Sequence, residues 1–276
     1  MNTSTKITIA KNASRVVRTV RHLMGMNKIV TCRRNGIVWE LDLTQGIDFS
    51  IYLFGAFEPE IVRYASRIIK PGAKVIDIGA NIGAHTLPLA HLVGPSGAVF
   101  AFEPTDYAFE KLLRNIHLNP NLKNRIHAFQ QILASSSKEN KPKAICSSWP
   151  LESNAEVHAV HRGQTMSLNA ASLTTLDIAA EQQRWESIDL VKMDVDGNEL
   201  FVLQGGKEFF QRFHPPILME FAPYLYQEYG YTLHELVECL SSMNYRCNLL
   251  PSQRAIDCAE LASMISAGGS LNILLT

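Results

Sequence analysis

The residues best suited to chemistry surround a glycine-containing segment, VIDIGANIGAHT, at residues 75–86. Its apolar start predicts a buried strand, and Asp77 is a carboxylate embedded near the carboxyl end of that strand. Because a buried acid needs a partner, we expect Asp77 to contact backbone amides or a bound cation. Gly79 and Gly83 bracket a tight turn into a helix, where glycine tolerates positive φ and lets a ligand approach the backbone. The segment therefore predicts a ligand site at the end of the strand.

A second acid follows at the end of the next predicted strand, in the segment AFEP, where Glu103 precedes Pro104. A carboxylate in this place can accept hydrogen bonds from both hydroxyls of a ribose, and the proline ends the strand. In the preceding turn, we expect Asn81 and Thr86 to satisfy turn amides or a carboxylate of the ligand. Together the two segments predict a site for an adenosyl compound.

The glycine turn differs from the dinucleotide-binding pattern GxGxxG, because its central glycine is missing. Asp77 also lies two residues before the first glycine, where an acid would repel a pyrophosphate. The same acid suits a cofactor with a sulfonium and an amino group, so we predict S-adenosylmethionine as the cofactor. An NAD-dependent oxidoreductase and a non-catalytic nucleoside-binding protein are the alternatives.

A third cluster of acids lies in the segment IDLVKMDVDGNE, where Lys192, Asp194 and Asp196 alternate along an apolar strand. Charged residues in a buried strand need mutual pairing, so we expect an acidic neighbour for Lys192. Glu199 opens the following helix, where the helix dipole favours an acid. Methyl transfer to a hydroxyl requires a base that takes the proton. The catalytic candidates are Asp194, Asp196 and Glu199, and Asp194 is also a candidate to bind the amino group of the cofactor.

Carboxylates of this cluster are also the ligands that Mg²⁺ or Ca²⁺ prefers. We consider a metal less favoured than pairing with lysine or substrate, and we predict no metal site. His85 and Glu220 are weaker candidates for the base. The four residues considered as metal ligands are Asp194, Asp196, Glu199 and Glu220.

The motifs VIDIGANIGAHT, AFEP, IDLVKMDVDGNELFVLQGG and PPILMEF, taken in this order, resemble the FkbM family of methyltransferases over about residues 57–221. The resemblance implies a Rossmann-like class I methyltransferase fold and O-methylation of a sugar, a glycan or a natural-product metabolite. It also implies that Glu58 lies near the cofactor. The family usually has D-x-E-G where this chain has Asp194-Val195-Asp196-Gly197, so the carboxylate at 196 is shorter.

The elements that carry these motifs alternate between strands and helices, which predicts an α/β fold with a seven-stranded mixed sheet. We expect an N-terminal helix and β extension over residues 1–56 and a methyltransferase domain over residues 57–276. Within the extension, Asn35-Gly36 predicts a hairpin, and the run FSIYLF predicts a further strand. A polar stretch at about residues 135–172 predicts an insertion that covers the substrate.

Composition narrows the classes of function. Hydrophobic residues make up 46% of the 276 residues, enough for a large core, and the zero net charge gives no sign of a nucleic-acid partner. The five cysteines are scattered, which predicts reduced thiols in a cytoplasmic protein. No apolar run has the length of a membrane span. We therefore expect a small-molecule or glycan substrate, and a homo-oligomer is left open.

Basic residues gather at the N-terminus, where Lys6, Lys11, Arg15, Arg18 and Arg21 are spread along a helix-like stretch. Such a helix can lie on an anionic membrane surface. The alternative is an amphipathic helix that caps the core.

Overall fold

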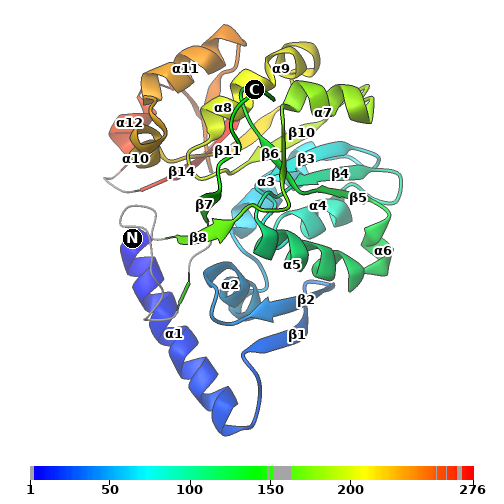
Figure 1. The fold of residues 1–276 in the computed structure, drawn as a ribbon, viewed down its shortest axis with the longest axis vertical. Coiled ribbons are helices and arrows are strands. Elements are labelled where there is room, and N and C mark those ends of the chain that lie inside the picture. The colour runs from blue at the N-terminus through cyan, green and yellow to red at the C-terminus, as the bar shows by residue number, and fades with distance from the viewer. Residues whose placement is uncertain (1–2, 148–149, 152–162, 253, 259, 266–268) are drawn as a thin grey trace.

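The centre of the computed structural model is an eight-stranded sheet (Figure 1). The structure describes residues 3–147, 150–151, 163–252, 254–258, 260–265 and 269–276. The strands of the sheet are β3 (Lys74–Ile78), β4 (Ala98–Phe102), β5 (Ile126–Phe129), β10 (Leu190–Met193), β11 (Ile217–Phe221), β12 (Cys247–Leu249), β13 (Arg254–Ile256) and β14 (Leu271–Leu275). Their order across the sheet is β13-β12-β14-β11-β10-β3-β4-β5.

The five strands from β11 to β5 are parallel, whereas β14, β12 and β13 pair with their neighbours in an antiparallel way. This arrangement confirms the Rossmann-like mixed sheet. The expected number of strands was one too low, because β13 was not foreseen. β13 has three residues at the sheet edge and none of them is buried, so it lacks the apolar signal of a core strand.

Helices cover both faces of the sheet (Figure 1). Alternate residues of each strand point to opposite faces, so Val75 packs against one layer while Ile76 and Ile78 pack against the other. The layer on the side of Val75 contains α3 (Pro59–Ile68), α4 (Thr86–Leu92) and α5 (Asp106–His117). The opposite layer contains α7 (Leu176–Gln183), α8 (Glu199–Gly205), α9 (Lys207–Phe213) and α11 (Leu233–Ser242). The short helices are α6 (Pro120–Lys123), α10 (Pro223–Tyr226), η1 (Gln227–Tyr229) and α12 (Leu261–Met264).

The N-terminal extension consists of two helices and a hairpin. They are α1 (Thr3–Leu23), β1 (Ile29–Arg34), β2 (Ile37–Asp42) and α2 (Gly46–Phe54). The hairpin at Asn35-Gly36 is confirmed, but the expected strand FSIYLF is wrong, because this run forms α2. Asp48 and Ile51 are three residues apart and both buried, a spacing that fits a helix face rather than a strand. Trp39 of β2 belongs to the same hydrophobic cluster as Val75, and the domain boundary at residue 57 stays a prediction.

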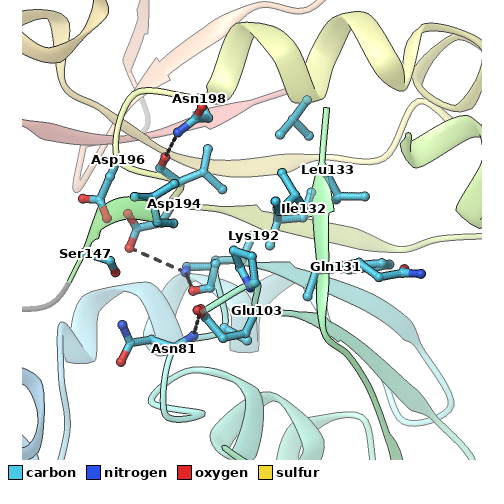
Figure 2. Close-up of a pocket in the computed structure, with 18 of the residues that line it drawn as sticks. Asn81, Glu103, Gln131, Ile132, Leu133, Ser147, Lys192, Asp194, Asp196 and Asn198 are labelled. Carbon is cyan, nitrogen blue, oxygen red and sulfur yellow. Dashed lines mark hydrogen bonds and ion pairs between the residues drawn. The ribbon is translucent and has the colours of Figure 1, made fainter. Parts of the chain in front are cut away.

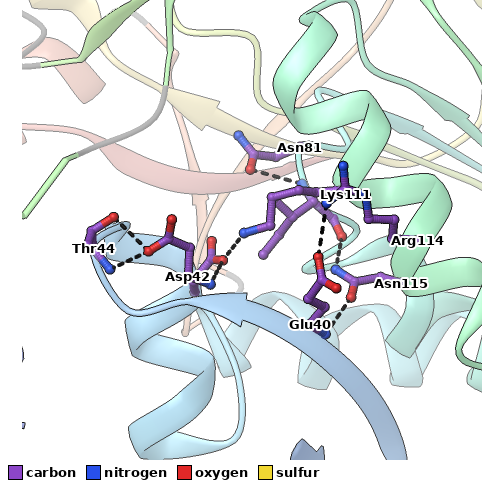
Figure 3. A network of polar contacts seen from close by, with 9 residues as sticks. Glu40, Asp42, Thr44, Asn81, Lys111, Arg114 and Asn115 are labelled. Atoms are coloured by element: carbon purple, nitrogen blue, oxygen red, sulfur yellow. Dashed lines mark hydrogen bonds and ion pairs between the residues drawn. The ribbon is translucent and has the colours of Figure 1, made fainter. Parts of the chain in front are cut away.

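Two buried asparagines, Asn115 of α5 and Asn119 just before α6, attach the hairpin to the central domain. Figure 3 shows the contact of Asn115 with Glu40. The backbone N–H of Glu40 donates to Oδ1 of Asn115 at 2.8 Å, and Asn115 Nδ2 donates to the carbonyl of Ile82 at 2.9 Å. Asn119 binds both the N–H and the carbonyl of Val38, at 2.9 and 2.7 Å. Side-chain amides thus satisfy backbone groups of β2, and Asn115 also fixes the glycine turn.

Four short strands lie beside the main sheet, within or next to the expected insertion at about residues 135–172. They are β6 (Gln131–Leu133), β7 (Ala144–Ser147), β8 (Gln164–Ser167) and β9 (Ser172–Thr174). β6 pairs with β9 in parallel, and β7 pairs with β8 in an antiparallel way. The neighbouring strands β5 and β6 therefore belong to different sheets. The segments 148–149 and 152–162 of the expected insertion lie outside the described residues.

The expectation of reduced cysteines is corrected at two positions. Cys247 of β12 and Cys258 form a disulfide with Cα atoms 5.6 Å apart, while Cys32 and Cys239 are free thiols. Sequence spacing had offered no CxxC pair, and it is the fold that brings these two residues together. None of the helices that the structure describes combines the length and the apolar character needed to cross a bilayer. The cytoplasmic location stays a prediction.

Asn115→Leu should destabilise the protein and weaken cofactor binding together. The change leaves the buried carbonyl of Ile82 and the N–H of Glu40 without partners, each at a cost of about 1–3 kcal/mol. Asn119→Leu is the matched control, since it removes contacts with β2 but none with the turn. Urea denaturation should show both losses, and calorimetry with S-adenosylhomocysteine should show weaker binding only for Asn115→Leu. Equal affinities in the two variants would contradict the role of Asn115 in holding the turn.

Candidate active site

The carboxyl ends of the parallel strands meet at one edge of the sheet, and a cavity lies there (Figure 2). Gly79 follows β3, Glu103 follows β4 and Asp194 follows β10, and all three line the cavity. Pro104 and Asn81 also contribute to its wall. A cavity thus lies beyond the strand ends, where we expected a ligand site.

A buried ion-pair network lies directly beneath the cavity. Lys192 and Asp77 are opposite each other in the paired strands β10 and β3. The Lys192 ammonium is 3.4 Å from Asp77 Oδ1 and 3.5 Å from Asp194 Oδ2, and it donates to the carbonyl of Gly79 at 3.1 Å. Burial lowers the pKa of Lys192, but the charges of Asp77 and Asp194 outweigh burial and the net shift is upward. The expected acidic neighbour of Lys192 is thus confirmed.

A ligand in the cavity cannot contact the carboxylate of Asp77. Its side chain is fully buried, and besides Lys192 it accepts a hydrogen bond from Thr86 Oγ1 at 2.6 Å. The expected partners, a bound cation or turn amides, are replaced by a lysine and a threonine of the chain itself. Asp77 and Thr86 therefore support the cavity from below, and their direct contact with a cofactor is corrected to an indirect role.

The two glycines of the turn are required by the protein's own packing. A Cβ on Gly79, which has φ +77°, would lie 1.8 Å from the backbone oxygen of Asp194. A Cβ on Gly83 would lie 2.4 Å from Leu87 and 2.9 Å from Leu112. The first glycine lets β3 and β10 approach each other, and the second lets α4 and α5 pack. Close packing within the chain is thus one reason for both glycines, and approach of a ligand to Gly79, which lines the cavity, stays a prediction.

Glu103 is held firmly at the cavity wall. Oε2 accepts from the N–H of Asn81 at 2.8 Å, and Oε1 accepts from the N–H and Oγ1 of Thr105 at 2.8 and 2.5 Å. Burial raises the pKa of Glu103, and these donors partly oppose the shift. A carboxylate offers about four acceptor positions, and three are in use. Oε2 thus has room for one ligand hydroxyl, whereas the sequence suggested two hydroxyls shared by the carboxylate.

Two acids of the cavity lining, Asp194 and Asp196, lie close to a third acid, Glu220. Carboxylate oxygens of Asp194, Asp196 and Glu220 all lie within 4.8 Å of one another. Burial and the neighbouring charge of Asp194 raise the pKa values of Asp196 and Glu220 well above their usual range. Glu58 also interacts with this group. Burial and the charge of Asp194 raise its pKa to about 7, and its side chain forms a hydrogen bond with Asn272.

Glu199 is separated from the cavity by the turn that it stabilises. It is buried, and its carboxylate accepts from the N–H of Gly197 and from the hydroxyl of Tyr231, both at 3.3 Å. Burial raises its pKa to about 7. The residue does not belong to the cavity lining, so the structure gives it a supporting place rather than the catalytic one that we expected.

His85 does line the cavity but is a poor base. Burial and the positive charge of Lys192 lower its pKa to about 4, so the imidazole is neutral at pH 7. Its Nε2 is buried and has no hydrogen-bond partner among the residues that the structure describes. A carboxylate with a raised pKa is better matched to proton transfer near neutral pH.

The insertion contributes Pro142, Ile145 and Ser147 to the cavity wall, and its role in covering a substrate stays a prediction. Asp106 at the start of α5 anchors the insertion. It accepts from Ser167 Oγ at 2.6 Å and from the N–H groups of Asn169 and Ala170 at 3.0 and 3.1 Å. These bonds hold the pKa of Asp106 below its usual range, with Ser167 the main contributor.

Part of the lining was not foreseen from the sequence. Ile132 and Leu133 of β6 form an apolar wall together with Val202 of α8, and Gln131 and Asn198 add polar groups (Figure 2). Apolar residues in a strand are expected in any core, so no sequence signal marks these as cavity residues.

Asn115 was also missed. Its signal was a polar residue beside Leu112 and Ile116 on the buried face of a helix.

Among solved structures, similar chains are methyltransferases of low sequence identity. An FkbM methyltransferase from Methylobacillus flagellatus KT is 14% identical, with a TM-score of 0.46 over 78% of this chain, which spans half of that protein's length. A putative rRNA methylase from Clostridium thermocellum is 13% identical, with a TM-score of 0.45 over 79% of this chain and 93% of that one. The M. jannaschii TYW2 complex with AdoMet is 14% identical, with a TM-score of 0.44 over 90% and 84%. Similarities at this level of sequence identity and TM-score give no information about the substrate.

None of the curated proteins compared with the chain matched it. The model of the methyltransferase FkbM domain, in contrast, matches residues 77–247, which is more than half of the sequence. This range includes the glycine turn, Glu103, Lys192 and the acids that follow β10. The chain therefore belongs to the FkbM family of methyltransferases, and its cofactor is S-adenosylmethionine.

Proposed function

We propose that this methyltransferase transfers the methyl group to a hydroxyl oxygen of a sugar, a glycan or a glycosylated natural product. The observation that carries the proposal is the group of three carboxylates, Asp194, Asp196 and Glu220, which lie within 4.8 Å of one another and of which Asp194 and Asp196 line the cavity. A hydroxyl loses its proton when its oxygen is methylated, so an acceptor of this class needs a base.

The electrostatics of the site fit a positively charged cofactor. The negative charge of Asp194 acts on Glu58, Asp196 and Glu220, whereas the positive charge of Lys192 acts on Glu58 and Asp196. Excess negative charge in a partly dry site is relieved by a cationic ligand. S-adenosylmethionine supplies an activated methyl group on a positively charged sulfur.

Separate parts of the cavity suit separate parts of the cofactor. Glu103 has a free acceptor position for a ribose hydroxyl. Ile132, Leu133 and Val202 offer an apolar slot for an aromatic base. Asp194, which is 26% exposed at its side chain, is placed to bind the amino group. These residues hold and orient the cofactor, and orientation is a large part of what methyl transfer requires.

Asp196 is the preferred base. It lines the cavity, and its backbone has φ 50°, a left-handed conformation that places it in the sharp turn before Gly197. Burial and the charges of Asp194 and Glu199 raise its pKa, which makes it a stronger base than an ordinary carboxylate. Glu220 is its close neighbour, and the pair can share the proton that the hydroxyl releases.

The acceptor class is supported by the polar part of the lining. Asn81, Gln131, Ser147 and Asn198 offer amides and a hydroxyl, groups that pair well with a polyhydroxyl ligand (Figure 2). A nucleic-acid acceptor is disfavoured, because acids at the cavity repel phosphates. The proposal is tested by incubating the full chain with methyl-labelled cofactor and a panel of sugars, phenols, amines and oligonucleotides. A new O-methyl signal on a sugar supports it, and transfer to a nitrogen or to a base ring contradicts it.

Glu103→Gln should weaken binding of S-adenosylhomocysteine by roughly 10- to 100-fold, because a charge-assisted hydrogen bond contributes about 1.5–3 kcal/mol. Calorimetry measures the affinity, and a melting curve checks the fold. Glu110→Gln on the exposed side of α5 is the matched control and should leave the affinity unchanged. An unaltered affinity in well-folded Glu103→Gln would remove Glu103 from the cofactor site.

Asp196→Asn should lower kcat by about 10²–10⁴-fold while the affinity for S-adenosylhomocysteine changes little. Asp196→Glu keeps the charge and should retain measurable turnover. Because the raised pKa leaves the acid protonated at moderately low pH, kcat of the native enzyme should fall as pH is lowered through that pKa. The acid limb should lie well above pH 4 and should vanish in Asp196→Asn. Should the limb persist there unchanged, another group is the base.

A further inference from the structure

The end of α1 carries a surface of unusual charge and exposure. The first 39 residues contain eight basic residues and no acidic one. Since the whole chain has 26 basic and 26 acidic residues, the remainder carries a net charge of −8. Positive charge is therefore concentrated in one part of the chain rather than spread over it.

The basic residues meet at the point where α1 turns into β1. Arg15, Arg18, Arg21, His22 and Lys28 line a shallow depression there. Arg21 stabilises the turn, because its Nε and Nη2 each donate to the carbonyl of Asn27 at 3.2 Å. We call residues 15–29 the α1 tip. Converging cationic side chains of this kind attract phosphate and carboxylate groups.

Exposed apolar side chains lie on the same α1 tip. Val16 is 63% exposed, Leu23 is 81% exposed, and Met24, Met26 and Ile29 are also largely exposed. The opposite side of α1 is used for packing, where Ser14 Oγ donates to the carbonyl of Leu43 at 2.6 Å and Val17 packs on the cluster of Leu43. The helix is thus seated on the protein by one side and presents apolar groups on another.

The position of the α1 tip leaves it accessible. In Figure 1 the carboxyl end of α1 projects from the body of the molecule, away from the sheet and its covering helices. A flat surface could approach this end without first meeting the rest of the protein. The combination of apolar groups and cations on a projecting helix end is what an interfacial membrane anchor requires.

We propose that the α1 tip docks on a bilayer containing anionic lipids, with Val16, Leu23 and Met24 entering the interface and the basic residues contacting headgroups. Charge decides between this occupant and a second copy of the chain. A two-fold dimer through the α1 tip would bring two positively charged surfaces together. An anionic bilayer instead neutralises the positive charge and removes the exposed apolar side chains from water. A nucleic-acid strand would leave the apolar side chains in water.

The test is sedimentation of the full chain with vesicles of phosphatidylcholine alone or with ~30% phosphatidylserine. We expect binding to the anionic vesicles only, and its loss at about 0.5 M salt. Arg15→Gln with Lys28→Gln should weaken binding about 30-fold, because each basic residue near an anionic surface contributes roughly fivefold. Lys123→Gln with Lys207→Gln, which removes two exposed charges elsewhere, is the matched control and should have no effect.

The apolar contribution is tested separately. Val16→Ser with Leu23→Ser should weaken vesicle binding about tenfold, whereas Leu113→Ser, at a position of α5 that is 45% exposed, should not. Circular dichroism and affinity for S-adenosylhomocysteine check that each variant is folded. Equal binding to both kinds of vesicle, insensitivity to the Arg15 and Lys28 changes, or a dimer in solution that Val16→Ser with Leu23→Ser abolishes would each overturn the proposal.

Discussion

The ion-pair network of Lys192 is the interaction on which the site depends. A single buried ammonium joins Asp77 of β3, Asp194 after β10 and the carbonyl of Gly79. Burying charges is costly, and loss of one partner from such a network typically costs about 3–5 kcal/mol. The network therefore fixes the relative position of the two strands whose ends form the floor of the cavity.

The single positive charge of this lysine does not neutralise the several acids around it. Glu58, Asp194, Asp196 and Glu220 share one neighbourhood, and burial together with mutual repulsion raises the pKa values of three of them, Glu58, Asp196 and Glu220. One physical cause thus serves two needs of the proposed methyl transfer to a hydroxyl. The excess negative potential favours a cationic cofactor, and a carboxylate with a raised pKa accepts a proton near neutral pH.

Charge is segregated along the chain as well as within the site. The N-terminal 39 residues are positively charged and the remainder is negatively charged. The hairpin that follows α1 is attached to the catalytic domain by Asn115, which also binds the glycine turn through Ile82. The extension is thus more than an appendage, because it shares a buried polar contact with the element that shapes the cofactor site.

The sequence by itself determined the family, the strand–helix alternation and the segments that end at the cavity, because buried strands, glycine turns and acids at strand ends leave local signals. It also indicated that Lys192 needs an acidic partner. Only the tertiary structure decided which acids face the cavity. Asp77, Thr86 and Glu199 are bound by the chain itself, whereas Asp194 and Asp196 meet Glu220 across β10 and β11. The FSIYLF run is helical where we expected a strand, and its buried residues Asp48 and Ile51 keep a helical spacing. The edge strand β13 pairs with β12, and the Cys247–Cys258 disulfide joins β12 to the residue shortly after β13. The contacts of Asp77 with Lys192 and of Asp194 with Glu220 join residues that are distant in sequence, and no local pattern encodes them.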